Sequence, residues 1–262
     1  MPHTVYDNFV LQNRIESTLT TRLDVNSLMT TNASLTAQPG MKIKIAKKTI
    51  SGNVEELAMG AGNTGEITVS TAESEYEVKT TQGKFVYYDE EEQRDPLIVD
   101  AGTQGLVEAM VNDMAAKAVA EFEKATLKHE YTESAGIKYD DVVDAVAKLN
   151  LEDESQLFML INPGVQAKLR KNLRDDLKYV ESFVRTGYIG TVNGIPVYIS
   201  KAMSDGKAVI ATREAVTNFV KKGTEVEQQR DGDTRKNTIY SRKVAVVALT
   251  DATKVVLITP GE

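Results

Sequence analysis

The chain of 262 residues is 41% hydrophobic, contains no cysteine and has a formal net charge of −7. This length suffices for one large domain or two modest ones with a buried core. The absence of cysteine excludes disulfides, thiol catalysis and cysteine metal sites, and it fits a protein made in a reducing cytoplasm. The longest apolar run, Val244–Leu249, is far too short to span a membrane, so we expect no membrane partner.

Charge is unevenly distributed along the chain. Residues 1–48 carry six Lys/Arg and three Asp/Glu, residues 49–134 carry six and eighteen, and residues 135–262 carry nineteen and seventeen. The three segments therefore have net charges of +3, −12 and +2, which give −7. The basic start and acidic middle could pair between neighbouring copies, or the acidic residues could form a solvated face. Nothing resembles the dense basic stripe of a sequence-specific nucleic-acid reader.

Residues 1–40 predict an extended arm. Asn8–Leu19 contains one or two weakly amphipathic turns, and Thr30–Thr36 is a polar run that precedes Pro39-Gly40. A segment of this composition cannot bury much of its own surface. It either stays mobile or lies on another surface.

Residues 41–88 predict a long two-stranded ribbon with a flexible tip. Apolar and polar residues alternate at period two in three stretches, Met41–Lys47, Glu66–Ser70 and Tyr76–Lys79. Gly52–Gly65 lies between the outer strands and is rich in small residues. Gln82-Gly83 predicts a turn before Phe85–Tyr88. Because an isolated ribbon is only marginally stable in water, we expect it to rest on another subunit.

The segment from about Asp100 to Glu130 predicts one long helix. Asp95-Pro96 comes just before it, with proline near the first turn. Apolar residues recur along one face at spacings of three and four: Leu106, Val107, Met110, Val111, Met114, Ala118 and Phe122. Thirty-one residues at a rise of about 1.5 Å would span roughly 45 Å. A helix of this length is typical of a domain spine.

The remaining sequence predicts a mixture of helices and strands. We expect helices at Asp140–Leu149, Val165–Leu173 and Arg213–Lys221. We expect strands at Gln156–Ile161, Pro196–Ser200, Lys207–Ala211, Thr238–Leu249 and Lys254–Thr259, with the last two forming a closing pair. Asn162-Pro163 predicts a helix cap, and Asn193-Gly194 predicts a two-residue hairpin turn. The predicted fold class is therefore α+β.

Two sequence motifs resemble ligand-binding sites. Gly60–Gly65 matches the dinucleotide fingerprint, but that site needs a strand before the glycines and a helix after them. A strand-like run follows here, so a mobile ribbon tip explains the glycines better. Asp89–Glu92 with Asp95 offers carboxylates for a divalent ion, yet consecutive residues of an extended chain point in alternate directions. A solvated acidic turn is the default interpretation.

The remaining titratable residues form no recognisable catalytic set. Only two histidines exist, His3 in the arm and His129 at the predicted end of the long helix, where a cation is favoured. A catalytic triad needs a base beside a nucleophile, and His129 has no such partner in the sequence. Hydrolysis by paired carboxylates stays open, although nothing selects two of the many acids. We expect no catalytic, cofactor-binding or metal-binding residues.

The order of these elements resembles the Hong Kong-97-type capsid fold of tailed bacteriophages. The resemblance covers nearly the whole chain and is most specific at Ile189–Ser200, Lys207–Ala211 and Ala215–Gly223. It implies an N-terminal arm at 1–40 and an extended loop at 41–88 that overlaps a neighbour. It also implies a peripheral domain with the spine helix, from 89–135 and 224–262, and an axial domain at 136–223.

The resemblance implies a major capsid protein that self-assembles, as pentamers and hexamers, into an icosahedral shell around double-stranded DNA. It implies a virion protein made in the host bacterial cytoplasm, with portal, scaffold or protease proteins as partners. Because the chain starts almost at the arm, we expect any scaffold to be separate or already removed. Three alternatives are open: a nanocompartment that encloses cargo enzymes, a hydrolase that uses acidic residues, and an adhesin or tail component.

The resemblance also indicates residues that act between subunits. Charged residues of the ribbon would pair with neighbours: Lys42, Lys44, Lys47, Lys48, Glu55, Glu56, Glu73, Glu75 and Glu77. One branch of the family joins a loop Lys to a peripheral Asn with help from a Glu seven residues later. Asn237 matches that Asn, and Lys47 or Lys48 would supply the amine. The seventh residue after it is Val244, so without the base we expect a non-covalent shell.

Overall fold

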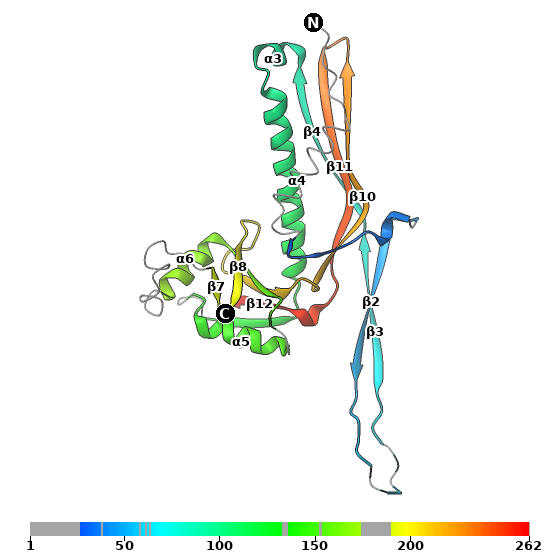
Figure 1. Cartoon of the computed structure of the whole chain (residues 1–262), viewed down its shortest axis with the longest axis vertical. Coiled ribbons are helices and arrows are strands. Elements are labelled where there is room, and N and C mark those ends of the chain that lie inside the picture. The colour runs from blue at the N-terminus through cyan, green and yellow to red at the C-terminus, as the bar shows by residue number, and fades with distance from the viewer. Residues whose placement is uncertain are drawn as a thin grey trace.

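The computed structural model describes residues 27–37, 39–57, 59–60, 62, 64–132, 136–151, 154–173 and 190–261. The predicted arm lies outside this part of the chain up to residue 26. In the described residues the protein has three parts (Figure 1): a tall helix-and-sheet unit, a compact mixed unit beside its base, and a ribbon that projects away from both.

The tall unit is a four-stranded sheet with one long helix along it. The strand order is β1 (Thr30–Asn32), β10 (Val216–Asp231), β11 (Lys236–Leu249) and β4 (Lys79–Tyr88). Helix α4 (Ile98–Phe122) packs on this sheet through Val99, Leu106, Val107, Met110 and Met114, which meet Tyr87, Val226 and Ile239. The short helix α3 (Asp89–Arg94) connects β4 to α4.

The compact unit is a six-stranded sheet with apolar residues on both faces. Its order is β5 (Leu127–Tyr131), β12 (Val255–Pro260), β9 (Ala208–Thr212), β6 (Leu157–Ile161), β8 (Ile195–Ile199) and β7 (Thr191–Val192). Met159 faces the side covered by α5 (Tyr139–Leu149) and α6 (Pro163–Asn172). Phe158 faces the other side, where the last turn of α4 inserts Phe122. Both β6 and β9 are buried along their whole length because both faces are covered.

Hydrogen bonds join the end of α4 to the compact unit. The Glu123 carboxylate accepts from Lys207 Nζ at 2.8 Å and from the Ser204 backbone N–H at 3.0 Å. Burial acts to raise the pKa of Glu123, but the bonds from Lys207 and Ser204 and the Lys207 charge outweigh it, so the pKa is lowered. The spine helix is therefore fixed to both units.

The ribbon is the hairpin of β2 (Lys42–Ser51) and β3 (Thr68–Glu77), which pair in unbroken antiparallel register from Lys42↔Glu77 to Ser51↔Thr68. The predicted ribbon at 41–88 is confirmed only as far as Glu77, because Lys79–Tyr88 forms β4 and pairs with β11 in the four-stranded sheet. The Asn162 cap of α6 and the Asn193-Gly194 turn, whose φ angles are 51° and 75°, are confirmed. The remaining short elements are two 3-10 turns, η1 (Ser34–Ala37) and η2 (Ala252–Lys254).

Two predicted helices were wrong in whole or in part. The long helix ends at Phe122, and Leu127–Tyr131 forms β5, in which exposed and buried residues alternate as in a strand. The predicted helix Arg213–Lys221 is instead the start of β10, where the β-branched and aromatic residues Val216, Thr217 and Phe219 are all buried. Those residue types favour a strand when the neighbouring surface is a sheet.

Two further expectations were wrong. Gln82-Gly83 is no turn but lies within β4, where the missing side chain of Gly83 makes room for Leu106; an added Cβ would lie 2.4 Å from Leu106 Cδ1. The last two strands form no closing pair, since β11 belongs to the four-stranded sheet and β12 to the six-stranded sheet. Such pairings depend on long-range packing, which local patterns do not report.

Gly102 and Gly105 of α4 form a matched pair for testing the contact between helix and sheet. A Cβ on Gly102 would lie 2.2 Å from the ring of Phe85, whereas one on Gly105 would meet nothing within 4 Å. Gly102→Ala should lower the free energy of unfolding by about 1–3 kcal/mol through overpacking. Gly105→Ala should raise it by about 0.5–1 kcal/mol, because alanine favours a helix. Urea unfolding measures both, and an equal gain from both substitutions would contradict this contact.

Candidate assembly interface

One face of the ribbon pairs several of its own charged residues. In the antiparallel register this face carries Lys42 and Lys44 on β2 and Glu73, Glu75 and Glu77 on β3. Lys42 Nζ lies 2.6 Å from Glu75, and Lys44 Nζ lies 3.9 Å from Glu73. Hydrogen bonding and charge attraction between Lys42 and Glu75 raise the pKa of the first and lower that of the second. Four of the predicted inter-subunit residues thus have partners within the chain.

The other predicted ribbon residues are placed as follows. Glu77 lies opposite Lys42 in the ladder. The backbones of Lys47 and Lys48 belong to β2, and their side chains lie outside the described residues. Glu55 and Glu56 are exposed in the segment that joins the two strands.

The ribbon tip, residues 52–67, is acidic and apolar. It contains Glu55, Glu56 and Glu66 and no Lys or Arg. Its side chains lie in the open: Val54 is 91% exposed, Ile67 is 62% exposed and Met59 is fully exposed. Exposed apolar residues gathered at the end of a projecting ribbon make it a candidate interaction surface. The sequence analysis noted the glycines of the tip but missed its apolar residues. A signal was present, because Val54 and Met59 do not continue the period-two alternation of the neighbouring strands.

A hydrogen-bonded clasp shapes the tip. The Glu55 carboxylate accepts from the Thr64 backbone N–H at 3.1 Å and from the Thr64 hydroxyl at 2.9 Å. These bonds hold the pKa of Glu55 below its ordinary value. The loop between β2 and β3 contains Gly60, Gly62 and Gly65. The next helix, α3, starts only at Asp89. The helix that a dinucleotide site requires is absent from this stretch.

The root of the ribbon is anchored in the tall unit. Val78 is 2% exposed, and its N–H donates to the Met41 carbonyl at 2.7 Å. Around it, Leu35, Phe219 and Ala248 form a buried cluster that Ile43, Ile45 and Tyr76 join from the ribbon. Burial, followed by the nearby Glu121 charge, raises the pKa of Tyr76. The ribbon is thus rigidly attached at one end only.

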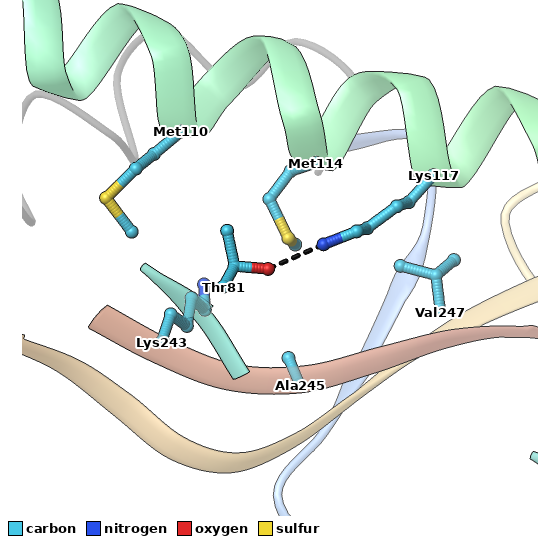
Figure 2. A pocket seen from close by; sticks show the side chains of 7 residues that line it. All are labelled: Thr81, Met110, Met114, Lys117, Lys243, Ala245 and Val247. Atoms are coloured by element: carbon cyan, nitrogen blue, oxygen red, sulfur yellow. Dashed lines mark hydrogen bonds between the residues drawn. The ribbon is translucent and has the colours of Figure 1, made fainter. Parts of the chain in front are cut away.

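A hollow of about 350 Å³ lies beside this root, between Tyr76 and Glu77 of the ribbon, Ala120 of α4 and Ala245 of β11. A smaller cavity of about 20 Å³, enough for one water, adjoins it between α4 and the sheet. Figure 2 shows Lys117 of α4 reaching across this cavity to Thr81 of β4, at 2.5 Å. Lys117 also contacts Asp113 at 2.5 Å. These groups bridge helix and sheet.

Asn237 lies in a polar cluster at the far end of the tall unit. It is 4% exposed, and its Nδ2 donates to Asp89 Oδ1 at 2.6 Å. Arg230 donates to the other oxygen of Asp89 at 2.7 Å. Asp89 is buried in the first turn of α3, so the predicted solvated acidic turn at Asp89–Glu92 was wrong for Asp89, whereas Glu90 is exposed. The cluster ties α3 to the β10–β11 hairpin.

His129 does not end the long helix as predicted. It lies on β5, and its Nε2 is 3.4 Å from Asp141 Oδ1 in the first turn of α5. Asp141 also accepts from the Lys138 backbone N–H at 2.7 Å, as expected of an acidic helix start. Among the described residues no group of three or more His, Asp or Glu is placed to hold a metal ion. No helix of the described chain is long and apolar enough to cross a membrane.

The phage capsid protein family matches residues 71–258, a stretch that runs from β3, the returning strand of the ribbon, to β12. The chain belongs to this family. Its members are structural proteins, and this phage capsid protein is accordingly a component of a virion and not an enzyme.

Related proteins cover almost the whole chain. The major capsid protein of Staphylococcus phage phiMR11 is 25% identical over 259 residues, which are 96% of this chain and 92% of that protein. The capsid of a native GTA particle has a TM-score of 0.76 at 12% identity and covers 92% of this chain and 90% of its own. A virus-like particle from Pyrococcus furiosus has a TM-score of 0.65 at 13% identity, and the match covers 95% of this chain and 98% of its own. These two structures establish a shared fold.

The Asp89 cluster yields a pH-dependent prediction. Asn237→Asp keeps the shape of the side chain but puts a second carboxylate 2.6 Å from that of Asp89. At pH 7 the free energy of unfolding should fall by about 2 kcal/mol or more. Repulsion raises the pKa of this carboxyl pair in the folded state, so the loss should shrink as pH falls and a proton is shared.

Urea unfolding from pH 7 to pH 4 measures this loss, with the exposed Asn53→Asp as the matched control. A loss that does not depend on pH, or an equal loss in the control, would refute the contact.

Proposed function

We propose that the chain is a major capsid protein with the Hong Kong-97-type fold, which assembles into an icosahedral shell around packaged double-stranded DNA. The observation that carries this proposal is the ribbon. It is anchored at its root, projects away from the rest of the chain (Figure 1) and ends in apolar residues that this chain leaves exposed. In the shell, neighbouring copies of the chain bury these apolar residues.

The proposed domains follow the predicted scheme. Residues 1–40 are the arm, 41–88 form the extended loop, 89–135 and 224–262 give the peripheral domain, and 136–223 give the axial domain. The sheet topology favours two adjustments. β4 pairs with β11 in the four-stranded sheet and is better assigned to the peripheral domain. In the six-stranded sheet, β12 pairs with both β5 and β9. We therefore assign β5 and β12 to the axial domain, which surrounds the symmetry axes of pentamers and hexamers.

Many modest contacts hold such a shell together. Weak individual contacts permit correction of errors, and their number makes the closed shell stable. The net charge of −7 suits DNA that a motor packs through a portal more than DNA that the coat condenses. A scaffold or protease would act as a further partner during assembly in the host cytoplasm.

The alternative is a nanocompartment that encloses cargo enzymes. One structure of the same fold, from Pyrococcus furiosus, is named a virus-like particle and not a virus, so the fold alone does not decide between the two. The sequence similarity to a major capsid protein, at 25% identity over 96% of this chain, favours the virion. Purified shells distinguish the two, because a virion contains DNA and a nanocompartment contains protein cargo.

Replacing residues 50–69 by Asn-Gly tests the role of the ribbon. Thr49 and Ser70 are paired in the ladder, so a two-residue turn joins them without changing the register. The variant should fold and stay soluble yet form no closed shells, because the contacts of the tip are lost. Negative-stain electron microscopy and circular dichroism measure this. Normal shells from the shortened chain would refute the role of the ribbon.

A second prediction concerns covalent chemistry. The Asn237 amide is 4% exposed and bonded to Asp89, and Val244 stands where a cross-linking relative has its Glu. Shells boiled in detergent should therefore give a single band of 28.8 kDa on a denaturing gel. A ladder of covalent multimers would show that this account of Asn237 is wrong.

A further inference from the structure

A hollow of about 390 Å³ lies against the compact unit, over the parallel pair of strands β6 and β8. Its floor is apolar and aromatic. Phe158 of β6 and Pro196 and Tyr198 of β8 line it, and the rings of Phe158 and Tyr198 meet edge to face with their centres 6.3 Å apart. Leu28 closes one side. A hollow of this size and lining can bury a bound group.

The hollow marks a gap in the cover of the six-stranded sheet. The opposite face of the sheet is covered by α5 and α6. On the face to which Phe158 belongs, Leu28 and Met29 pack with Phe122 from the end of α4, but Tyr198 of β8 stays half-buried. Strands paired in parallel are normally buried on both faces. Further apolar cover is therefore missing beside Leu28 in the described part of the chain.

Arg213 lies at the rim of the hollow and supplies a positive charge. It is exposed and makes no ion pair with any residue that the structure describes. The neighbouring carboxylate, Glu214, is bound to Lys254. A segment that fills the hollow therefore gains most if it combines apolar side chains with a nearby negative charge.

The chain itself brings such a segment to the hollow. Leu28 lines it, and the Thr30 hydroxyl donates to the Arg213 carbonyl at 3.1 Å, so the residues directly before Leu28 start beside both the floor and the arginine. Their sequence includes Leu23-Asp24-Val25, one carboxylate between two apolar residues. Asp24 is only four residues from Leu28, which keeps the two Cα atoms within about 14 Å of each other.

We propose that Leu23 and Val25 fill this hollow in the same chain and that Asp24 pairs with Arg213. The inference goes beyond the proposed function, because it concerns the single chain. It fixes the base of the arm on the compact unit and leaves residues 1–22 to reach other surfaces.

A tryptophan placed in the arm tests the docking, because the chain has no tryptophan of its own. In the unassembled full chain, Leu23→Trp should emit at a shorter wavelength than Leu11→Trp, the control further up the arm, since the docked indole is removed from water. Unfolding in urea should abolish the difference. Equal emission from the two folded variants would overturn the docking.

Charge reversal in the L23W chain tests the ion pair. R213E should raise the ratio of undocked to docked arms by about fivefold, because an attractive exposed pair becomes repulsive. Adding D24R should return the ratio to within about twofold of that of L23W alone. The control is K168E, which reverses an exposed lysine of α6 on the opposite face of the sheet and should leave the emission unchanged. An effect of R213E that D24R does not reverse would overturn the proposal.

Cross-linking shows which chain supplies the segment, because the protein contains no cysteine. D24C/R213C treated with a short bismaleimide should give an internally linked monomer, detected by mass spectrometry of its peptides, and L11C/R213C should give far less. An equal mixture of the single variants D24C and R213C should stay monomeric on a denaturing gel. Dimers from the mixture would mean that a neighbouring copy supplies the segment, against docking within one chain.

These readouts use unassembled chains, whereas the proposed function is tested by the shells and their contents. Failure of the docking would therefore leave the proposed function standing, and wild-type chains that form no shells would leave the docking standing.

Discussion

The apolar residues of the ribbon tip set the constraint on which the rest of the structure depends. Val54, Met59 and Ile67 lie in the open in a single chain, and exposing such groups to water is unfavourable. The chain does not fold the tip back, because the β2–β3 ladder runs unbroken and holds it away from both sheets. Under the proposed function another copy buries these residues, and the subunit is then complete only within the assembly.

The remaining structure makes this projection rigid. The cluster around Val78 fixes the root of the ribbon to the four-stranded sheet, and α4 stiffens that sheet along its length. Glu123 then joins the end of α4 to the compact unit through Lys207 and Ser204. On the ribbon stem, Lys42 pairs with Glu75 and Lys44 with Glu73.

Local sequence patterns predicted the elements whose cause is local. The ribbon strands, the cap at Asn162 and the Asn193-Gly194 turn were all foreseen, because alternation, capping and turn chemistry are properties of neighbouring residues. Gly83 was misread as a turn because its actual role, making room for Leu106, depends on a helix that comes later in the chain. The segment at Val216 was predicted to be a helix for the same reason. It forms a strand because it pairs with β11, which comes later in the chain.

The same distinction applies to the candidate interface. The ribbon charges were recognisable in sequence, but their mutual pairing needed the register of β2 against β3. Asn237 was located through a resemblance, whereas its partner Asp89 is 148 residues away and emerged only from the structure.

Oxidation of Met59 before and after assembly tests the central claim most directly. Limited peroxide converts exposed methionines to sulfoxides, and mass spectrometry measures the rate at each position. Buried Met110, at 4% exposure, serves as the internal reference. The account predicts that Met59 reacts rapidly in dissociated subunits and at least about tenfold more slowly in closed particles. Equal rates in the two states would show that sister subunits do not cover the tip.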